Sequence, residues 1–504
     1  MQRIKNAVLL GCMLLFVLSG VAMAENPANQ TPFITSFTYQ NIGSGTATVS
    51  FSFYSQASGN RVTTVSRTLP AGAGSSIFMG ALLGSEALPS AFIGSAVMQS
   101  NQPLAIIQVQ IPQSTTVKNR PLSIVFPSGS SPIYVATVLK NKFNAMTKLA
   151  VQNVHTTNAD LTLKFYNADD PAAAPIEIQK DNLPPGGMAY YDAGTLPGLA
   201  DGFNGSAVVT GVENDTTTPA NIVATTLELQ TNDVGARAVE AISQAAKTLY
   251  VATALCNAFG GQTTAYAVQN TNLSTATEVT VHYSNGTNET KTAQPGAKVS
   301  FSGCAASGMP TGFSGAATIT SSATDIIAIA KVSGLGYFTA FMAETAGASK
   351  LALPYIRYTS DANYNTGARQ RAFIAIQNIG ATDVSNVQVK YLDTNGTVVG
   401  THTIATIAPN AKANSKAIDA SGNSASLLEF GTPEGNPAGS GFGGSVVIEG
   451  PAGSQLIAIA RITSKIGAGE VAEDYNALVI DGTALTSGMA AAYTYSAPLV
   501  LLNQ

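Results

Sequence analysis

Ala150-Val151-Gln152-Asn153 is the stretch that organises this chain, because it recurs. Ala267-Val268-Gln269-Asn270 and Ala375-Ile376-Gln377-Asn378 repeat it almost letter for letter, and Thr38-Tyr39-Gln40-Asn41 keeps the Gln-Asn pair. The four asparagines stand 112, 117 and 108 residues apart. A unit of about 110 residues is an ordinary length for a small β-sandwich.

Each Gln-Asn pair is followed by the same landmarks in the same order. An alternating apolar run comes first and ends on an aromatic residue, which is the pattern of a strand with one buried face. A turn follows, and then Phe-x-Gly, at Phe92, Phe203, Phe313 and Phe442. We interpret this phenylalanine as a core anchor and the glycine as a site of close backbone approach. The pattern predicts an all-β protein with four tandem β-sandwich repeats in an elongated chain.

The landmarks also set the expected segment boundaries. Repeat 1 should be incomplete, because it lacks the opening strand that repeats 2 and 3 carry at Ile133 to Leu139 and Leu249 to Leu255. Ala236 to Lys247 is rich in helix formers and predicts a short helical connector. The expected segments are a signal peptide at 1–24, β-sandwich repeats at 32–115, 131–232, 248–335 and 350–465, and a tail with an orphan strand at 466–504.

The N-terminus has the order of a secretory signal peptide. A basic start is followed by the apolar run Ala7 to Val21 and then by the small residues Ala22-Met23-Ala24. This predicts cleavage between Ala24 and Glu25 and a secreted protein, extracellular or at the cell surface. Cleavage before Cys12, as in a lipoprotein, is the weaker alternative, because it would leave the apolar residues Met13 to Val21 on the mature chain. No later stretch has the ~20 continuous apolar residues of a membrane helix, so we expect no span after cleavage.

The charge balance argues against a nucleic-acid partner. The chain has 25 Lys and Arg against 29 Asp and Glu. The expected cleavage removes Arg3 and Lys5, which leaves 25 − 2 = 23 basic residues and a net charge of 23 − 29 = −6. Binding to a phosphate backbone needs a basic stripe, and the sequence has none.

We expect no catalytic residues, no cofactor and no metal, and therefore no enzyme. His155, His282 and His402 do not recur at equivalent places, and none stands beside a serine or cysteine motif. The cluster at 167–170 and the sequence Asp393-Thr394-Asn395-Gly396 lack the spaced carboxylates of a calcium loop. Asn-Gly between strands is first of all a hairpin turn.

Two cysteines remain after the expected cleavage, Cys256 and Cys304, and both lie in repeat 3. An oxidising compartment allows them to pair, so we expect a disulfide. Two buried free thiols are the alternative.

The two ends of the chain are mismatched in a complementary way. Repeat 1 lacks an opening strand, and the chain ends in a strand that opens no repeat. Aligning this tail with the opening of repeat 2 pairs Val500 with Val138 and Leu501 with Leu139. A missing strand leaves an open groove with unpaired backbone groups. The orphan strand comprises Ala497, Pro498, Leu499, Val500, Leu501, Leu502 and Asn503.

These features predict a subunit of an extracellular filament or surface layer. Its C-terminal strand would enter repeat 1 of the next molecule, so that the partner is the protein itself in a head-to-tail homopolymer. Two other placements remain open for the tail: folding back on repeat 4, or filling repeat 1 of its own chain. The alternative function is a surface adhesin that binds a ligand, including other cell-surface components, through its loops. The insertion Ser421 to Ser440 is the best candidate for such a loop.

The repeated pattern resembles tandem immunoglobulin-like, adhesion-type β-sandwich modules of bacterial surface proteins. The resemblance covers the mature chain and lies in its strand rhythm and the short landmarks above. It implies a surface or extracellular role and transfers no functional residues.

Overall fold

The computed structural model describes residues 28–114, 116–117, 119–365, 370–422, 427–430, 444–466, 469–481 and 493–503. The expected signal peptide and the cleavage site between Ala24 and Glu25 lie outside the described residues, as does most of the 421–440 insertion. Within the described ranges, no helix is both long enough and apolar enough to cross a membrane.

The four repeats are called units 1 to 4 from here on, and unit 2 contains a complete sandwich. One sheet, with strand order β11-β10-β13-β8, contains the opening strand, and the other, with order β12-β9-β14-β15, contains the Gln-Asn strand. Alternate residues of β10 are buried in the core between the two sheets, as the alternating run predicts. The strands are β8 (Ile133–Lys140), β9 (Ala145–Asn153), β10 (Ala159–Asn167), β11 (Ile176–Leu183), β12 (Met188–Asp192), β13 (Phe203–Glu213), β14 (Ile222–Gln230) and β15 (Ala236–Glu240).

Unit 3 repeats this arrangement. Its sheets have the orders β16-β21-β18-β19 and β20-β17-β22-β23. The strands are β16 (Thr248–Cys256), β17 (Thr263–Asn270), β18 (Thr277–Tyr283), β19 (Asn288–Ala293), β20 (Lys298–Ser302), β21 (Phe313–Ser321), β22 (Ile326–Gly334) and β23 (Tyr337–Met342).

Unit 4 repeats it with additions at the edges. Its sheets have the orders β29-β27-β26-β30-β24-β33 and β28-β25-β31-β32. A short helix, α1 (Asp361–Asn365), lies between β24 and β25 in the chain. The strands are β24 (Lys350–Leu353), β25 (Gln370–Asn378), β26 (Val384–Leu392), β27 (Val398–Ile407), β28 (Lys412–Ser415), β29 (Ser421–Gly422), β30 (Ser445–Glu449), β31 (Leu456–Ile466), β32 (Gly469–Asn476) and β33 (Leu478–Val479).

Unit 1 is built from both ends of the chain. Its strands have the order β3-β2-β5-β34-β1-β6-β7, with β4 also paired to β1. The all-β fold of tandem β-sandwich repeats is therefore confirmed. The strands are β1 (Phe33–Asn41), β2 (Ala47–Ser55), β3 (Arg61–Leu69), β4 (Gly74–Phe78), β5 (Phe92–Ser100), β6 (Leu104–Pro112), β7 (Leu122–Ile124) and β34 (Tyr493–Leu502).

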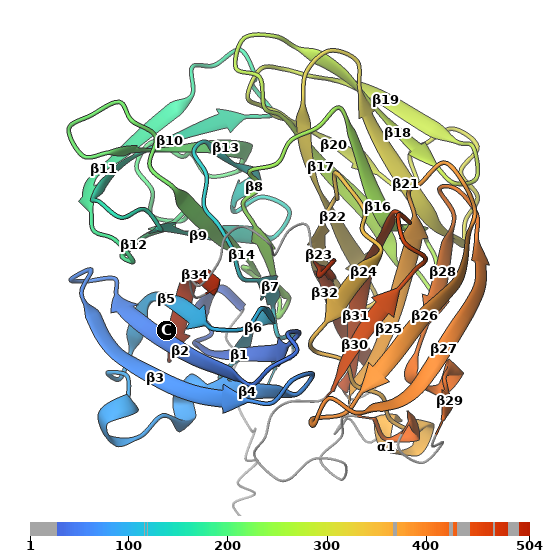
Figure 1. The fold of residues 1–504 in the computed structure, drawn as a ribbon. Helices are drawn as coiled ribbons and strands as arrows, with labels where there is room; N and C mark the ends of the chain where they lie inside the picture. The colour runs from blue at the N-terminus through green and yellow to red at the C-terminus, as the bar shows by residue number, and fades with distance from the viewer. Residues whose placement is uncertain are drawn as a thin grey trace, which may run out of the picture.

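The four units lie around a common centre, so that unit 4 returns to unit 1 (Figure 1). We expected an elongated chain whose last strand leaves for another molecule. In the structure the path of the chain curves, and the backbone N–H of Gly74 in unit 1 donates to the carbonyl of Thr394 in unit 4 at 3.2 Å. Because the chain curves back on itself, its tail reaches unit 1 of the same chain, which is one of the placements that the sequence left open.

The connector between units 2 and 3 differs from the prediction. Ala236 to Lys247 was expected to be helical, but β15 (Ala236–Glu240) pairs with β14 and all five of its residues are buried. Tertiary burial here outweighs a helix propensity worth only tenths of a kcal/mol per residue.

The asparagine of each Gln-Asn pair joins three chain segments. Asn153 is fully buried; its Nδ2 donates to the carbonyls of Thr157 and Leu183 at 2.8 Å, and its Oδ1 accepts from the backbone N–H of His155. Equivalent Nδ2 and Oδ1 bonds recur at Asn41, Asn270 and Asn378. Only an amide side chain offers two donors and an acceptor at this length, which explains why the residue type recurs.

Phe-x-Gly has the structural role expected of it. The ring of Phe203 lies over Gly205, where an added Cβ would stand 2.5 Å from the ring and 2.2 Å from the carbonyl of Tyr166. Gly94 and Gly315 are covered in the same way by Phe92 and Phe313. In unit 4 the expected Phe442 lies outside the described residues, and a different phenylalanine, Phe430, covers Gly444.

Candidate functional site: the strand junction and the centre of the ring

Strand β34 has two buried faces. Tyr495, Ala497 and Val500 pack in the core of unit 1, while Leu499 and Leu501 pack against unit 2 in a cluster that contains Leu227 and Met188. Burying one large apolar side chain contributes roughly 1.5–3 kcal/mol. The strand therefore stabilises both unit 1 and its contact with unit 2.

Polar groups fix this strand in place. The N–H of Leu501 donates to Oγ1 of Thr35 at 2.8 Å, and the N–H of Leu104 donates to the hydroxyl of Tyr495 at 2.8 Å. The carbonyl of Leu499 accepts from the side-chain amides of Gln108 and Gln110. The buried backbone groups of the strand thus have partners on both sides.

The register of β34 is that of an opening strand. Val500 lies opposite Gly94, as Val138 lies opposite Gly205 in unit 2. The strand pairing of β34 with β5 shifts between Ala497 and Val500, directly beside the pair with Gly94. In unit 2 the pairing of β8 with β13 shifts at the same place, directly beside the pair with Gly205. Pro498 falls within this irregularity, where a residue without an N–H costs no ladder hydrogen bond. A left-handed asparagine follows the strand in units 1, 2 and 3, at Asn503, Asn141 and Asn257.

Neighbouring units are joined by two recurring hydrogen bonds. The serine after Phe-x-Gly donates to a turn carbonyl of the next unit: Ser95 to Gly186, and Ser206 to Gly296. The glutamine of each Gln-Asn pair reaches back, so that Nε2 of Gln269 donates to Gly296 in its own unit and to Ala207 in unit 2. Gln152 bonds Gly186 and Ala96 in the same way.

The last strands of the four Gln-Asn sheets, β7, β15, β23 and β32, meet at the centre of the ring (Figure 1); we call them the central strands. Next to them, Glu228 on β14 is fully buried between Arg237 on β15 and Lys331 on β22. Burial alone would raise the pKa of Glu228, but the two cations lower it to about 2. The guanidinium of Arg237 also lies 3.8 Å from the ring centroid of Phe338 on β23.

A second buried pair links units 3 and 4. Arg461 on β31 donates to both carboxylate oxygens of Asp474 on β32, at 2.8 and 2.7 Å. Thr339 on β23 donates to the same carboxylate, so this pair holds a central strand of each unit. Ion pairs of this kind are costly to break, because removing one partner leaves a buried charge.

Three other buried carboxyl groups near the centre form no ion pair in the described part of the chain, although the charge of Arg120 acts on one of them, Glu473. Burial raises the pKa of Glu240 and of Glu344 to about 7 and that of Glu473 to about 8. Each accepts a hydrogen bond, from the N–H of Ile124, the amide of Asn476 and the N–H of Arg120 respectively. The first bond ties β7 to β15, and the other two tie β32 to the segments just after β23 and just before β7.

The residues weighed as catalytic or metal-binding candidates lie apart. His155 pairs with Glu213 at 2.9 Å in unit 2, His282 contacts Thr320 in unit 3, and His402 contacts Ser415 in unit 4. The 167–170 cluster is held by Lys142 and Asn204, which both bond Asp169. Asp393 accepts from the N–H groups of Asn395 and Thr397, as in a turn. Among the residues described, no three metal-ligating side chains gather.

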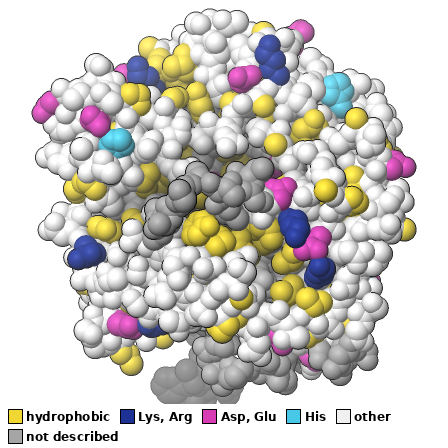
Figure 2. Space-filling model, viewed as in Figure 1, with side chains coloured by type: hydrophobic (Ala, Val, Ile, Leu, Met, Phe, Trp, Pro, Cys, Tyr) yellow, Lys and Arg dark blue, Asp and Glu magenta, His cyan; other side chains and the backbone are white. Residues whose placement is uncertain are grey.

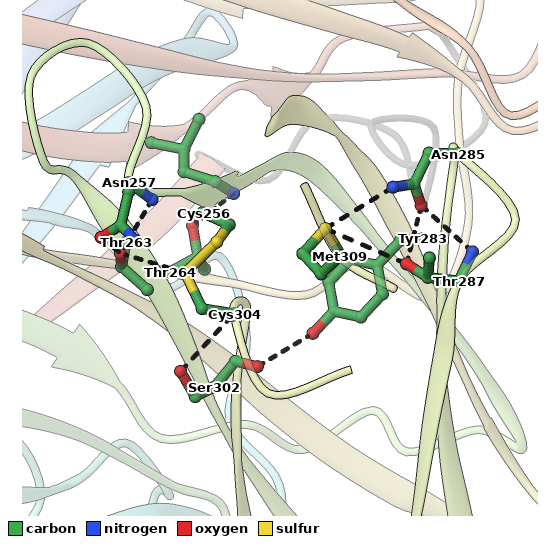
Figure 3. Close-up of a disulfide and its surroundings, with 11 residues drawn as sticks. Cys256, Asn257, Thr263, Thr264, Tyr283, Asn285, Thr287, Ser302, Cys304 and Met309 are labelled. Atoms are coloured by element: carbon green, nitrogen blue, oxygen red, sulfur yellow. Dashed lines mark hydrogen bonds between the residues drawn. A yellow bond between two sulfur atoms is a disulfide. The ribbon is translucent and has the colours of Figure 1, made fainter. Parts of the chain in front are cut away.

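Cys256 and Cys304 form a disulfide in unit 3 (Figure 3). Their Cα atoms are 4.9 Å apart. Cys256 ends the opening strand β16, and Cys304 follows β20 in the other sheet, so the bond links the two sheets of the sandwich. Thr263 lies against Sγ of Cys304 at 3.6 Å.

Charged side chains of both signs are scattered over the face in Figure 2, and neither sign forms a broad patch there. The central ion pairs were not predicted from the sequence, because each joins neighbouring strands whose pairing is known only from the structure, and Lys331 reaches Glu228 from another unit. The nearest available signal was the presence of Glu228, Arg237 and Lys331 in strands that are otherwise apolar.

Comparison with known proteins gives little. No family model and no curated protein matches the chain. A solved structure, a tetra-tandem repeat in the extending region of a large adhesion protein, aligns over 87% of this chain and 93% of that one. The identity is 12% and the TM-score is 0.11, so this similarity carries no argument about fold or function.

Proposed function

We propose that the protein is an exported surface protein with a structural role, in which the C-terminal strand closes a ring of four β-sandwiches. The observation that carries the proposal is the place of β34, between β5 and β1 of unit 1 in its own chain. The buried charges support a scaffold rather than an enzyme, because they hold the central strands β15 and β32 to the strands beside them. The signal-like N-terminus supports export.

Strand exchange between molecules is the second candidate, and it would build the filament expected from the sequence. Every contact of β34 described above is made with units 1 and 2, so another copy of the chain can supply the same strand. Such an exchange is a head-to-tail domain swap and need not close. The same-chain strand has the higher effective concentration, so closed monomers should prevail in dilute solution.

A pair of engineered cysteines separates the two forms. Thr494 on β34 lies opposite Gln99 on β5, and both are exposed. The variant Gln99→Cys/Thr494→Cys should oxidise within one chain and run as a monomer on a non-reducing gel. A ladder that collapses on reduction would instead establish the filament. Each single-cysteine variant is the control for random cross-linking.

Export needs its own test. The full chain, expressed in a secretion-competent host, should appear outside the cytoplasm with Glu25 as its first residue. Protein retained in the cytoplasm with residues 1–24 intact would overturn the proposal, whatever the form of β34.

A further inference from the structure

The interface between units 3 and 4 lacks the links found between units 1 and 2 and between units 2 and 3. Ala316 stands where Ser95 and Ser206 donate their hydroxyl hydrogen bonds. Gln377 is completely buried, and neither its Nε2 nor its Oε1 has a hydrogen-bond partner in the described part of the chain. These two units are therefore packed together without the recurring polar contacts.

A cavity of about 510 Å³ opens at this interface. Its walls come from β16, β21 and β23 of unit 3 and from β25, β28, β31 and β32 of unit 4. The carboxylate of Glu470 on β32 accepts from the hydroxyls of Tyr337 and Tyr364. A volume of several hundred Å³ is typical of small-molecule sites. At the equivalent interface between units 2 and 3, Lys298 matches Lys412 in register, but it is buried and donates to Oγ1 of Thr137.

Lys412 is the cation of this cavity that is left for a ligand. Arg461 is engaged by Asp474 and Gln262, and Lys416 lies against Asp419. The ammonium of Lys412 donates a hydrogen bond to the hydroxyl of Ser314 at 3.3 Å, and among the described residues no carboxylate forms an ion pair with it. Burial, and secondarily the charge of Arg461, lowers the pKa of Lys412 to about 8, so it is still mainly protonated at neutral pH.

Two aromatic rings border the same cavity. Phe259 is 69% exposed and Phe373 is 40% exposed, although both are large apolar side chains. An exposed ring offers a flat apolar face, which suits the C–H face of a sugar. Ser314 and Asn414 add hydroxyl and amide groups that can bond sugar hydroxyls.

We propose that the cavity between units 3 and 4 binds a small acidic saccharide, with the sugar carboxylate on Lys412 and the sugar ring on Phe259. An ammonium–carboxylate contact in a partly enclosed site is charge-assisted and stronger than one between neutral groups. The ring contact gives preference for a sugar over a simple carboxylate. This site is independent of how β34 closes the ring.

The test is calorimetric titration of the full mature chain with methyl β-D-glucuronide, methyl β-D-glucoside and sodium acetate. We expect the glucuronide to bind at least ten-fold more tightly than either of the other two. Lys412→Met, which keeps the length of the side chain without its charge, should weaken glucuronide binding at least ten-fold. Phe259→Ala should weaken it several-fold.

Phe143→Ala is the matched control, because Phe143 follows the opening strand of unit 2 and is also 69% exposed but does not border the cavity. It should leave binding unchanged. Circular dichroism melting checks that every variant is folded. The proposal fails if the glucuronide does not bind, if the glucoside or acetate binds equally well, or if folded Lys412→Met binds like the parent chain.

Discussion

The hydroxyl of Ser206 donates a 2.9 Å hydrogen bond to the carbonyl of Gly296, across the boundary between units 2 and 3. Ser95 makes the same bond to Gly186 between units 1 and 2. The sequence repeat is therefore a repeat of contacts between units as well as of the fold within each unit.

Replacing this serine should loosen one boundary. Ser206→Ala removes a buried hydrogen bond, but Gly296 still accepts from Gln269. We expect a loss of about 1 kcal/mol in the free energy of unfolding, measured by chemical denaturation. Ser66→Ala, at an exposed position on β3, should change it by less than about 0.5 kcal/mol. Equal effects of the two changes would contradict this role of Ser206.

The glycine of Phe-x-Gly should tolerate no side chain. In Gly205→Ala the new Cβ would meet the carbonyl of Tyr166 at 2.2 Å and the ring of Phe203 at 2.5 Å. Backbone cannot move aside as a flexible side chain can, so we expect a loss of about 3 kcal/mol. Thermal melting of the purified variant measures this, and an unchanged melting temperature would show that the close approach is not required.

The disulfide should contribute more than either of these contacts. Cys256 and Cys304 are 48 residues apart, and closing a loop of that size is worth roughly 4 kcal/mol in the chain-entropy model. Cys256→Ser/Cys304→Ser should therefore unfold at clearly lower denaturant concentration than the oxidised parent. The reduced parent should behave like the double variant. Mass spectrometry that finds two alkylatable thiols in the untreated protein would contradict the bond.

Stability should fall as the pH rises from about 4.5 to about 8. Glu240, Glu344 and Glu473 have raised pKa values when folded, so the folded state holds protons that the unfolded state has already lost in this range. The lowered pKa of Glu228 acts in the opposite sense, but only as the pH falls below about 4.5.

Melting temperature against pH checks this dependence. Glu473→Gln keeps an acceptor for the N–H of Arg120 and removes the titration, so it should flatten the profile. Glu86→Gln is a suitable control, because Glu86 pairs with Arg67 at the surface of unit 1. A profile that rises over this range would exclude the role of the central carboxyl groups.

The sequence predicted the fold class and the recurring residues, but not all of their partners. Gln152, Asn153 and Phe203 were recognisable because four copies place them at fixed positions in one strand order. The alignment of Val500 with Val138 also gives the register found in the structure. These positions can be predicted because each pattern spans only a short segment of sequence and recurs in the other copies.

The helical interpretation of Ala236 to Lys247 was wrong because pairing with β14 and burial decide the conformation of β15. The curvature of the ring could not be predicted from the sequence either, because it depends on contacts such as the one between Gly74 and Thr394, which are 320 residues apart. The cavity beside Lys412 lies where the interface between units 3 and 4 differs from the other interfaces. A single difference of this kind does not recur in the sequence, so a search for repeats does not find it.

Thr35 and Leu501 are hydrogen-bonded although they are 466 positions apart in the sequence, and this separation imposes an order on biosynthesis. Units 2, 3 and 4 contain all their own strands and can each fold as soon as they emerge from the ribosome. Unit 1 is synthesised before the other three units, but its groove is filled only after β34 (Tyr493–Leu502), which follows unit 4 in the sequence, has been made. Unit 1 is therefore the last of the four sandwiches to become complete, and until then the edges of β5 and β1 that face its groove lack their partner strand.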